Sequence, residues 1–430
     1  MTGPDAPGER DPDARYRLLL GISQQISRTI DLQEVLNHLL WSLRSVVDYD
    51  AAGIFVLNRS VPGGAAPGAN LIAGMASVGF PGIAGGSDPM LRHGKGIVGH
   101  VVRTGEVVVA PDVSRDPRYV QGRTETRAEI AVPIVSNAEV IGALNLESDS
   151  LDAFSERDAE LLEAFAVAAA ISIEKAVLHR QLIEKHKMEH QLKLAQEVQA
   201  SLLPGEDPAV PGYDIAGFNL PALDIGGDYF DYLPLPGGRL GLVIADVSGK
   251  GVPAALLMAT FRAALRSEVR RDRPIPAVVE DVHATLLESM DTSRFVTAVY
   301  GVLEPGSGHF TYVNCGHNPP MLLRAGGERE ILPAGRAALG MLDSRPAAAS
   351  TARLDPGDTL LLYTDGVVEL TDAGDEEFGE ARLARALAGA AGRPAREIIA
   401  MLLDATRAHA VRERYDDDFT LVVVKREPAR

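Results

Sequence analysis

The sequence is poor in cysteine and aromatic residues. It has one cysteine, Cys315, one tryptophan and 5% aromatic residues in 430. A single thiol cannot form a disulfide within the chain, and this usage fits a reducing compartment. No apolar run reaches the roughly 18 residues of a membrane-spanning helix, and the Pro-, Gly- and Asp-rich residues 1–15 lack the apolar core of a signal peptide. We therefore expect a cytoplasmic protein that does not enter a membrane, with residues 1–15 as a disordered tail.

Basic residues are also scarce. Lys and Arg number 42 against 59 Asp and Glu, which gives a net charge of -17. This balance argues against binding to nucleic acid or to anionic membranes, because both require a basic surface. The chain contains no Gly-x-x-x-x-Gly-Lys-Ser/Thr phosphate loop, which disfavours a nucleotide hydrolase of that type. With 46% apolar and 23% charged residues, a chain of this length is typical of a globular protein of two or three domains.

The N-terminal third alternates between helical and strand patterns. An apolar stripe from Leu32 to Leu43 follows Asp31, which is suited to cap a helix. Residues 61–86 are rich in Gly, Pro and Ala and predict long turns. Residues 136–139 form a hairpin signal between two strand-like runs. The patterns predict helices over 16–49 and 96–103 and strands over 51–58, 107–110, 130–135 and 140–147.

A long helix is predicted between residues 156 and 203, because no Gly or Pro interrupts this stretch. Ser155 and Asp158 have nearly the spacing of a capping box. The first half is apolar enough to pack on the N-terminal domain, whereas 176–203 is highly charged. An incomplete heptad seam can be followed through Ile171, Leu178, Leu182, Leu192 and Leu203, with Lys185, Glu189 and Gln196 interrupting it. The second half is therefore either a solvated linker helix or a parallel coiled coil that dimerises the protein.

Strands in hairpin order with helices between them follow residue 204, which indicates an α+β domain with mostly antiparallel sheets. The predicted strands are 213–220, 228–234, 240–246, 295–303, 309–314, 321–324, 359–363 and 420–425, and the predicted helices are 252–270, 276–290, 380–387 and 395–412.

Four aspartates of this region stand where an apolar run begins or ends: Asp228, Asp246, Asp365 and Asp417. A single Asp before a Gly is usually a turn residue, but all four adjoin core strands. Carboxylates gathered there would repel one another unless cations neutralised them, and all-oxygen ligands favour Mg²⁺ or Mn²⁺. Two such ions could hold a hydroxide between them and polarise a phosphate ester. We therefore expect hydrolysis without a covalent protein nucleophile.

The motifs around these aspartates occur in a familiar order. They are 195–204 (AQEVQASLLP), 221–231, 246–251, 295–297, 314–320 (NCGHNPP), 363–369 (YTDGVVE) and 417–420 (DDFT). Together they resemble the SpoIIE/RsbU-like branch of the PPM (type 2C) metal-dependent Ser/Thr protein phosphatases, over about residues 192–425. The resemblance implies an αββα sandwich with two Mn²⁺ or Mg²⁺ ions between its sheets.

The resemblance also implies roles for individual residues. Asp246 would bridge the metals, the Val247 carbonyl would bind one of them, and Asp228, Asp365 and Asp417 would complete the inner ligands. The second-tier candidates are Asp418 (ranked behind Asp417), Asp231, Gly227 and Lys250. Asp231 and the nearby Asp224 could bind water held by the metals, and Lys250 could bind the substrate phosphate. The phosphate-binding Arg of the eukaryotic relatives has no clear counterpart upstream of Gly227. Cys315 is expected in the core, and His317 is expected to fix the turn at 314–320.

Residues 32–173 resemble a GAF domain, a six-stranded sheet with helices on one face that in this family binds a small molecule or a protein. The matching segments include 94–99 (GKGIVG), 110–113 (APDV), 131–134 (AVPI) and 141–146 (IGALNL). The ligand of this domain stays unknown. Cys315 is the chain's only thiol, so no cysteine here could anchor a bilin. His93 and His100 are read as surface residues and not as haem ligands.

These observations predict three parts: a GAF sensor at 16–175, a linker helix at 176–204 and a phosphatase domain at 205–430. The expected function is a GAF-regulated Ser/Thr phosphatase that acts as a homodimer on a phosphorylated anti-sigma factor antagonist of the STAS type. The alternative is a catalytically weak module that binds a phosphoprotein.

Overall fold

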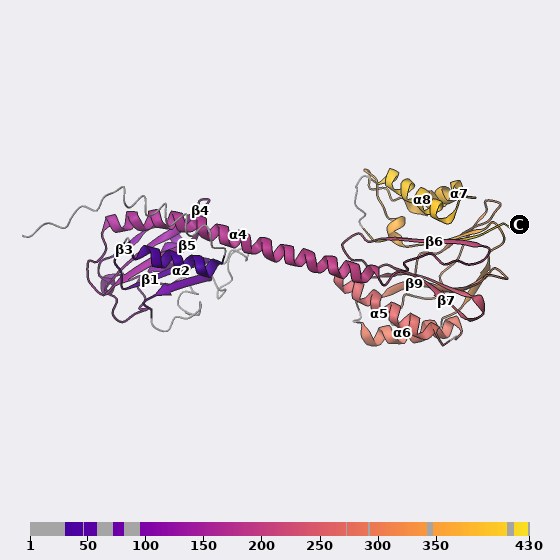
Figure 1. Ribbon diagram of the computed structural model, residues 1–430, viewed down its shortest axis with the longest axis horizontal. Helices are drawn as coiled ribbons and strands as arrows, with labels where there is room; N and C mark the ends of the chain where they lie inside the picture. Colours follow the sequence, from indigo (N-terminus) through magenta and orange to yellow (C-terminus); the bar gives the residue numbers. More distant parts are fainter. Residues whose placement is uncertain are drawn as a thin grey trace, which may run out of the picture. The chain divides into compact units, whose positions relative to one another are not determined.

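The computed structural model describes residues 31–45, 47–57, 72–80, 95–271, 273–290, 293–341, 347–410 and 417–428 (Figure 1). Its internal contacts divide the chain into two compact units, residues 1–187 and 188–430. Within the described ranges, every helix is too short or too polar to span a bilayer.

The N-terminal unit is built on an antiparallel sheet with the order β2-β1-β5-β4-β3. Helices α2 and α4 pack on one face of this sheet, and α3 packs on the other. Asp31 caps α2 as expected, because its Oδ1 accepts hydrogen bonds from the amides of Gln33 and Glu34. The elements are α2 (Leu32–Leu43), β1 (Ala51–Leu57), β2 (Ile72–Val78), α3 (Gly96–Thr104), β3 (Val108–Ala110), η2 (Val113–Arg115), β4 (Ala128–Ser136), β5 (Glu139–Ser148) and α4 (Glu156–Ala200).

One expectation for this unit is wrong, because helices cover both faces of the sheet and not one. The sequence also missed β2 within the stretch 61–86, where long turns were predicted; this Gly- and Ala-containing strand pairs along its length with β1, which stabilises it. The described residues contribute five strands to the sheet, and the expected number of six stays a prediction. The predicted helix start at residues 16–30 lies outside the described residues.

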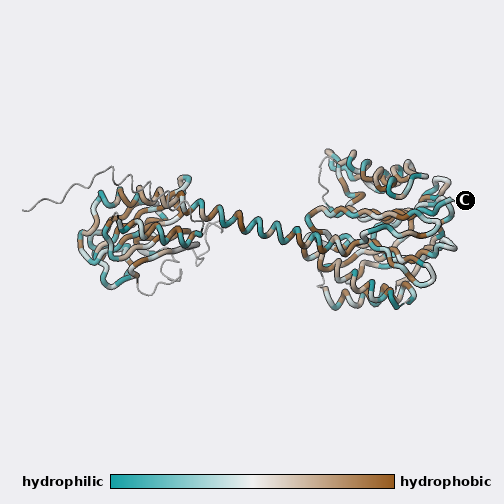
Figure 2. Tube along the Cα trace, viewed as in Figure 1, coloured by the Kyte–Doolittle hydropathy of each residue, from teal (hydrophilic) through white to brown (hydrophobic). Residues whose placement is uncertain are grey.

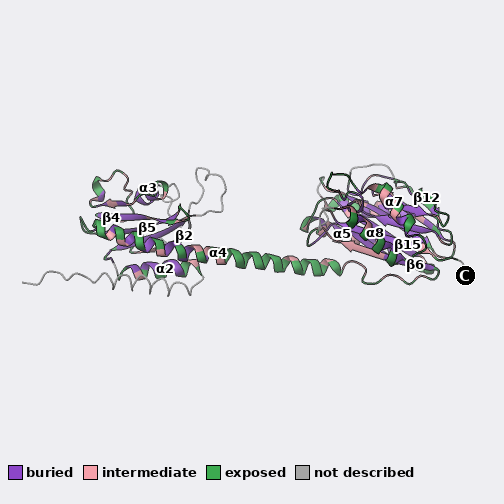
Figure 3. Cartoon of the chain, turned by 90° about the horizontal axis from the view of Figure 1, so that it is seen from above, coloured by how far each residue is buried: buried purple, intermediate pink, exposed green. Residues whose placement is uncertain are grey.

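Helix α4 is continuous over 45 residues, as its lack of Gly and Pro predicted. The capping box is confirmed, since the Asp158 carboxylate accepts from the Ser155 amide at 2.9 Å and the Asp158 amide donates to Ser155 Oγ at 3.4 Å. The first turns bury Leu162, Phe165 and Ile173 against the sheet. The helix then becomes exposed, as the green stretch of Figure 3 shows.

The C-terminal unit is a sandwich of two five-stranded sheets, which confirms the expected αββα architecture. One sheet has the order β13-β10-β9-β8-β7, and the other has the order β12-β11-β14-β15-β6. The strands are β6 (Tyr213–Leu220), β7 (Tyr229–Pro234), β8 (Leu240–Val247), β9 (Val296–Glu304), β10 (His309–Cys315), β11 (Met321–Leu323), β12 (Arg329–Ile331), β13 (Ser350–Arg353), β14 (Thr359–Tyr363) and β15 (Phe419–Arg426).

Two pairs of helices cover the outer faces of this sandwich (Figure 1). Helices α5 (Val252–Val269) and α6 (Ile275–Ser289) pack on the first sheet, and α7 (Gly379–Gly389) and α8 (Ala395–His409) pack on the second. The short helices η3 (Pro236–Gly238) and η4 (Asp365–Val367) lie in loops. The predicted strands and helices are all present. The sequence missed β12 and β13, because both are short and largely exposed and so lack a clear alternation of apolar residues.

Hydrophobic residues are frequent along the strands of both sheets (Figure 2), and alternating side chains bury both faces of each sheet. On β8, Leu242 and Ile244 point into the layer between the sheets, whereas Val243 and Ala245 contact the residues of α5 and α6. A strand buried on both faces reads as a continuous apolar run, which is how residues 240–246 appear in the sequence.

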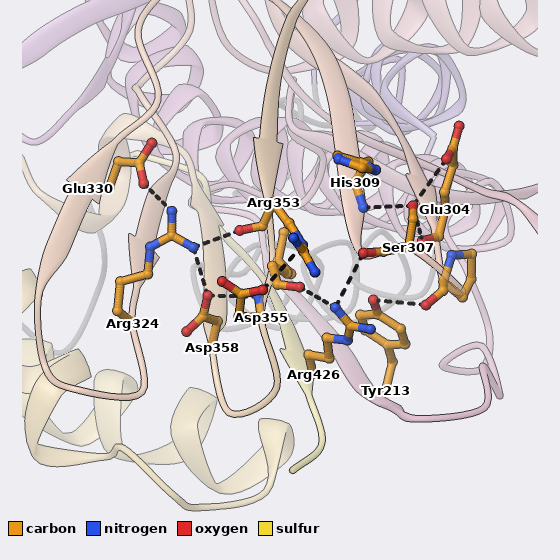
Figure 4. Close-up of polar contacts among 12 residues, drawn as sticks. Tyr213, Glu304, Ser307, His309, Arg324, Glu330, Arg353, Asp355, Asp358 and Arg426 are labelled. Atoms are coloured by element: carbon orange, nitrogen blue, oxygen red, sulfur yellow. Dashed lines mark hydrogen bonds and ion pairs between the residues drawn. The ribbon is translucent and has the colours of Figure 1, made fainter. Parts of the chain in front are cut away.

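One rim of the sandwich is closed by polar side chains (Figure 4). Asp358, which is 2% exposed, accepts from Arg324 Nη1 at 2.8 Å and from the Ala325 amide at 2.9 Å. Arg426, at the end of β15, donates to the carbonyls of Leu354 and Ser307. These bonds tie the start of β14 and the end of β15 to the neighbouring loops. They fix the strands whose opposite ends carry Asp365 and Asp417.

Asp231 has a structural role and does not lie among the candidate metal ligands, where the sequence had placed it in the second tier. It points from β7 toward α5, and Arg266 holds both of its oxygens at 2.7 and 2.9 Å. The Tyr229 hydroxyl and the Tyr232 amide donate to the same carboxylate. With all its acceptors engaged and 2% exposure, Asp231 joins the first sheet to its covering helix.

We expect Arg266→Met to destabilise the C-terminal unit by roughly 2 kcal/mol, because it leaves the buried Asp231 carboxylate without its charged partner. Urea unfolding of the full chain measures this. Arg270→Met, at an exposed position just beyond the same helix, is the matched control and should change stability by less than about 0.5 kcal/mol. Equal stability of the two variants would contradict the role given to Asp231.

Candidate metal centre

Four strand ends bring the predicted aspartates to the rim opposite the one just described. Asp228 directly precedes β7, and Asp246 lies one residue before the end of β8. Asp365 follows β14 by two residues, and Asp417 precedes β15 by two. The strands are antiparallel neighbours within each sheet, with Tyr229 paired to Ala245 and Tyr363 to Leu421. This topology places two aspartates from each sheet at one edge of the sandwich.

The four aspartates lie close enough together for their charges to interact. Burial first, and then Asp365 and Asp417, raise the pKa of Asp246 to about 7. Burial and the charge of Asp246 raise the pKa of Asp228 well above its usual range. Burial and Asp417 raise the pKa of Asp365. The charged forms of Asp228, Asp246 and Asp365 are therefore disfavoured, and a nearby cation would remove this cost.

The donor set fits divalent cations that prefer oxygen. It combines carboxylates from both sheets with the Val247 carbonyl oxygen. This oxygen lies close to Gly227, since a Cβ at that position would be only 2.7 Å from it. The carboxylates are not already gathered around one centre, since the described residues include no group of three His, Cys, Asp or Glu side chains placed to hold a metal ion. The positive group that the structure does place here is Lys250, whose Nζ is 2.9 Å from Asp417 Oδ2.

Asp228 is oriented by two threonines from the opposite sheet. Thr364 Oγ1 and Thr420 Oγ1 donate to its Oδ2 at 2.8 and 2.6 Å. Asn219 donates to Thr420 Oγ1 at 2.8 Å and extends the network to β6. Both hydroxyls bind Oδ2 of Asp228 and not its Oδ1. The sequence analysis gave neither threonine a role, although both belong to the motifs YTDG and DDFT.

Asp418 holds the glycine turn before Asp228. Its Oδ2 accepts from the Gly227 amide at 2.6 Å, and its Oδ1 accepts from the Ala222 amide at 2.8 Å. A Cβ at Gly226 would lie 2.3 Å from Asp418 Oδ2, so only glycine allows this approach. The structure thus separates two adjacent acids: Asp418 binds backbone amides, whereas Asp417 faces Lys250.

The end of α4 also contacts this turn. Gln199 Nε2 donates to the Gly226 carbonyl at 2.6 Å, and the Gly226 amide donates to Gln199 Oε1 at 3.1 Å. This two-way contact fixes the turn that carries Asp228 to the last helical residues of the motif AQEVQASLLP. A glutamine in a charged helix gives no sequence signal for such a role.

His317 is a buried structural residue, as expected. Asn314 braces its turn, because the His317 amide donates to Asn314 Oδ1 at 2.9 Å and Asn314 Nδ2 donates to the His317 carbonyl at 3.1 Å. The ring Nδ1 lies 2.8 Å from Thr297 Oγ1, and Thr297 pairs with Asp246 across β9 and β8. Burial lowers the pKa of His317 to about 4, so the ring is neutral near pH 7.

The other polar candidates lie apart from these groups or play no catalytic part. Cys315 is 2% exposed and burial raises its pKa to about 12, which confirms an unreactive core thiol. Asp224 is exposed. His100 lies on α3 of the other unit, near Glu106, and His93 lies outside the described residues. Glu369 was not singled out by the sequence, yet its pKa is raised by partial burial and then by Asp365, which makes it a further acid at this rim.

Comparisons with known proteins agree with this architecture. Residues 236–427 match the family model of Stage II sporulation protein E (SpoIIE), and residues 29–174 match that of the GAF domain. The SiaA-PP2C domain of Pseudomonas aeruginosa shares the fold of the C-terminal unit, with a TM-score of 0.50 and 21% identity over 56% of this chain and 98% of that chain.

Two curated relatives are similar in sequence. The phosphoserine phosphatase RsbU of Bacillus subtilis is 26% identical over 245 residues, which cover 56% of this chain and 72% of RsbU. The protein IcfG of Synechocystis is 28% identical over 263 residues, but the match spans only 41% of its length. The chain thus joins a region that matches the GAF family model to a region that matches the SpoIIE family model, and its C-terminal unit has the fold of the SiaA-PP2C domain.

Proposed function

We propose that the C-terminal unit is a metal-dependent protein phosphatase that hydrolyses phosphoserine or phosphothreonine and that the GAF domain regulates it. The observation that supports this most is the convergence of Asp228, Asp246, Asp365 and Asp417 at one rim, with raised pKa values on three of them. The similarity to the phosphoserine phosphatase RsbU supports the same reaction class.

The residues of this chain would have the following roles in metal binding and hydrolysis. Asp246, the Val247 carbonyl, Asp228, Asp365 and Asp417 would hold two Mn²⁺ or Mg²⁺ ions. When bound, such ions supply Lewis acidity to a phosphate ester and acidify a water molecule that attacks it. Thr364 and Thr420 would keep Asp228 in one rotamer, since both donate to the same oxygen.

Lys250 is the substrate-facing residue of this proposal. Its side chain is half exposed and its partner Asp417 is 37% exposed, so the ammonium group can leave the carboxylate without crossing a packed core. Lys250 would contact the substrate phosphate from the side of Asp417. It would then have the role of the phosphate-binding arginine of the eukaryotic relatives.

We further infer that the substrate is a phosphorylated anti-sigma factor antagonist of the STAS type. The similarity to RsbU and to the phosphoserine phosphatase RsbP of Bacillus subtilis, at 25% identity over 192 residues, supports a phosphoserine protein as the substrate class. The net charge of -17 disfavours a nucleic-acid substrate.

Asp246→Asn and Asp365→Asn should lower Mn²⁺-dependent hydrolysis of a phosphoserine peptide by at least about a hundredfold, because each removes a charged ligand. Both variants should stay folded. The thermal midpoint of the wild-type protein should rise when Mn²⁺ is added, and that of Asp246→Asn should not. Phosphate release and differential scanning fluorimetry measure these effects.

Asp404→Asn, at an exposed position on α8, is the control and should retain wild-type activity. Parental activity of Asp246→Asn in Mn²⁺ would overturn the metal assignment. A wild-type protein that binds a phosphoserine peptide but shows no chelator-sensitive hydrolysis would favour the alternative, a phosphoprotein-binding module.

Asp417→Asn and Asp418→Asn should separate two functions of adjacent acids. Asp417→Asn should lose activity and keep its stability, because Asp417 is partly exposed and its partner is the exposed Lys250. Asp418→Asn should lose roughly 1–3 kcal/mol of stability, because an amide cannot accept from both the Ala222 and Gly227 amides. Chemical unfolding and phosphate release distinguish them, and the reverse pattern would exchange the two roles.

We also infer that the protein dimerises through α4. Four exposed apolar residues, Val167, Ile171, Leu178 and Leu182, are spaced by four, seven and four positions and so share one face of the helix. A second copy of this helix would cover that face. The seam weakens further along, where Lys185, Glu189 and Gln196 occupy the same face.

Leu178→Glu combined with Leu182→Glu should convert a dimer into a monomer, because two charges would enter the seam. Light scattering coupled to size exclusion measures the mass at several concentrations. Lys187→Glu, on the opposite side of the helix, should remain dimeric. A wild-type mass equal to one chain at every concentration would reject the dimer.

A further inference from the structure

The connection between β10 and β11 crosses from one sheet of the sandwich to the other, since β10 belongs to the first sheet and β11 to the second. Cys315 ends β10 and pairs with Ala298, near the start of β9. The start of β9 pairs in turn with the end of β8, where Asp246 lies. The crossover 316–320 is therefore at the rim that carries the four aspartates. His317 stands within this crossover and is 4% exposed.

The His317 ring contacts the first sheet through Thr297. Its Nδ1 lies 2.8 Å from Thr297 Oγ1, and the same hydroxyl lies 3.5 Å from the carbonyl oxygen of Asp246. Thr297 is also the residue of β9 that pairs directly with Asp246 of β8. One side chain thus separates the ring from the backbone that carries this aspartate.

The ring also faces the second sheet. The backbone of Tyr363, the last residue of β14, raises the pKa of His317 against the larger effect of burial. The ring Nε2 is inaccessible to solvent and has no hydrogen-bond partner among the described residues, so the approach to Tyr363 is a contact and not a completed hydrogen bond. Thr364 and Asp365 follow directly, and Thr364 Oγ1 donates to Asp228 Oδ2 at 2.8 Å.

The separation of the two sheets at this rim decides where the candidate metal ligands lie. The first sheet carries Asp228 and Asp246, and the second carries Asp365 and Asp417. Functional groups must be held within about 0.5 Å of their productive geometry, so a group that sets the distance between the sheets also sets the ligand geometry. An imidazole suits this position because it is rigid. Burial lowers the pKa of His317 to about 4, so the ring adds no charge to the rim near pH 7.

We propose that His317 is a positioning residue that holds the two sheets at the distance the metal ligands require. On one sheet it contacts Thr297, which pairs with Asp246. On the other it contacts the backbone of Tyr363, two residues before Asp365. This role rests on the proposed function, because it requires that the rim binds divalent cations. It includes no proton transfer and no contact with the substrate.

Thr297→Val tests the contact with the first sheet, because it removes the hydroxyl and keeps the branched shape of the side chain. Binding of Mn²⁺ to the full chain, measured by isothermal titration calorimetry, should weaken by at least about tenfold, as is usual when a partner behind a metal ligand is lost. Thr297→Ser keeps the hydroxyl and should bind Mn²⁺ as the wild-type protein does.

His317→Asn tests the contact with the second sheet. Asn keeps a polar atom near the position of Nδ1 but is too short to approach Tyr363, so Mn²⁺ binding should again weaken by at least about tenfold. The double variant with Thr297→Val should bind about as weakly as the weaker of the two single variants, because both changes break the same link.

Thr311→Val is the matched control, with the same substitution on the same sheet. Thr311 lies on β10 toward the opposite rim, and its Oγ1 is 3.2 Å from Thr351 Oγ1 of β13. Its Mn²⁺ binding should equal that of the wild-type protein. Urea unfolding without metal establishes that each variant is folded under the conditions of the calorimetry.

Two results would overturn the role of His317 while leaving the proposed function intact. One is a folded Thr297→Val or His317→Asn that binds Mn²⁺ as tightly as the wild-type protein, because these contacts would then serve the fold alone. The other is an equal loss of binding in Thr311→Val, because the effect would then not belong to this rim. A wild-type chain that binds no Mn²⁺ would overturn the proposed function and this role together, so the two failures are distinguishable.

Discussion

Repulsion among buried carboxylates is the constraint on which the C-terminal unit depends. Asp228, Asp246 and Asp365 are partly or fully removed from water beside one another, and burial is the first cause of the raised pKa of each. Such an arrangement persists only because the rest of the sandwich holds the strand ends in place. The threonines behind Asp228, the Asp418 carboxylate under the glycine turn and the polar network of the opposite rim all serve this purpose.

The contacts around these strand ends also explain why neighbouring acidic residues have different surroundings. Asp418 binds the amides of Ala222 and Gly227 with both of its oxygens, and Arg266 holds both oxygens of Asp231. Asp417 accepts from the Asp418 amide with Oδ1 and pairs through Oδ2 with Lys250, whose side chain is half exposed. The contacts of each carboxyl group, and not its place in an acidic run, decide whether it can serve as a ligand.

The GAF unit also contains buried carboxylates that lie opposite each other. Glu129 and Glu147 are also buried and opposed, but they lie under α3 in the middle of a sheet and not at its rim. Their neighbours are an amide, a hydroxyl and one guanidinium group. Helix α4 contributes buried residues to this unit, and its last turns contact Gly226 in the other unit. Each unit therefore has its own contact with this helix.

The sequence by itself determined the secondary structure of the sandwich apart from the short strands β12 and β13. It also determined the long helix with its capping box and the four aspartates at strand ends, because apolar periodicity, caps and strand-end motifs are local signals. It missed β2, whose Gly- and Ala-containing residues form a strand only through pairing with β1. It also could not assign Asp231, Asp418, Gln199 or the two threonines. Their roles depend on contacts between residues distant in sequence, such as the 190 positions between Asp228 and Asp418, and only tertiary structure brings such groups together.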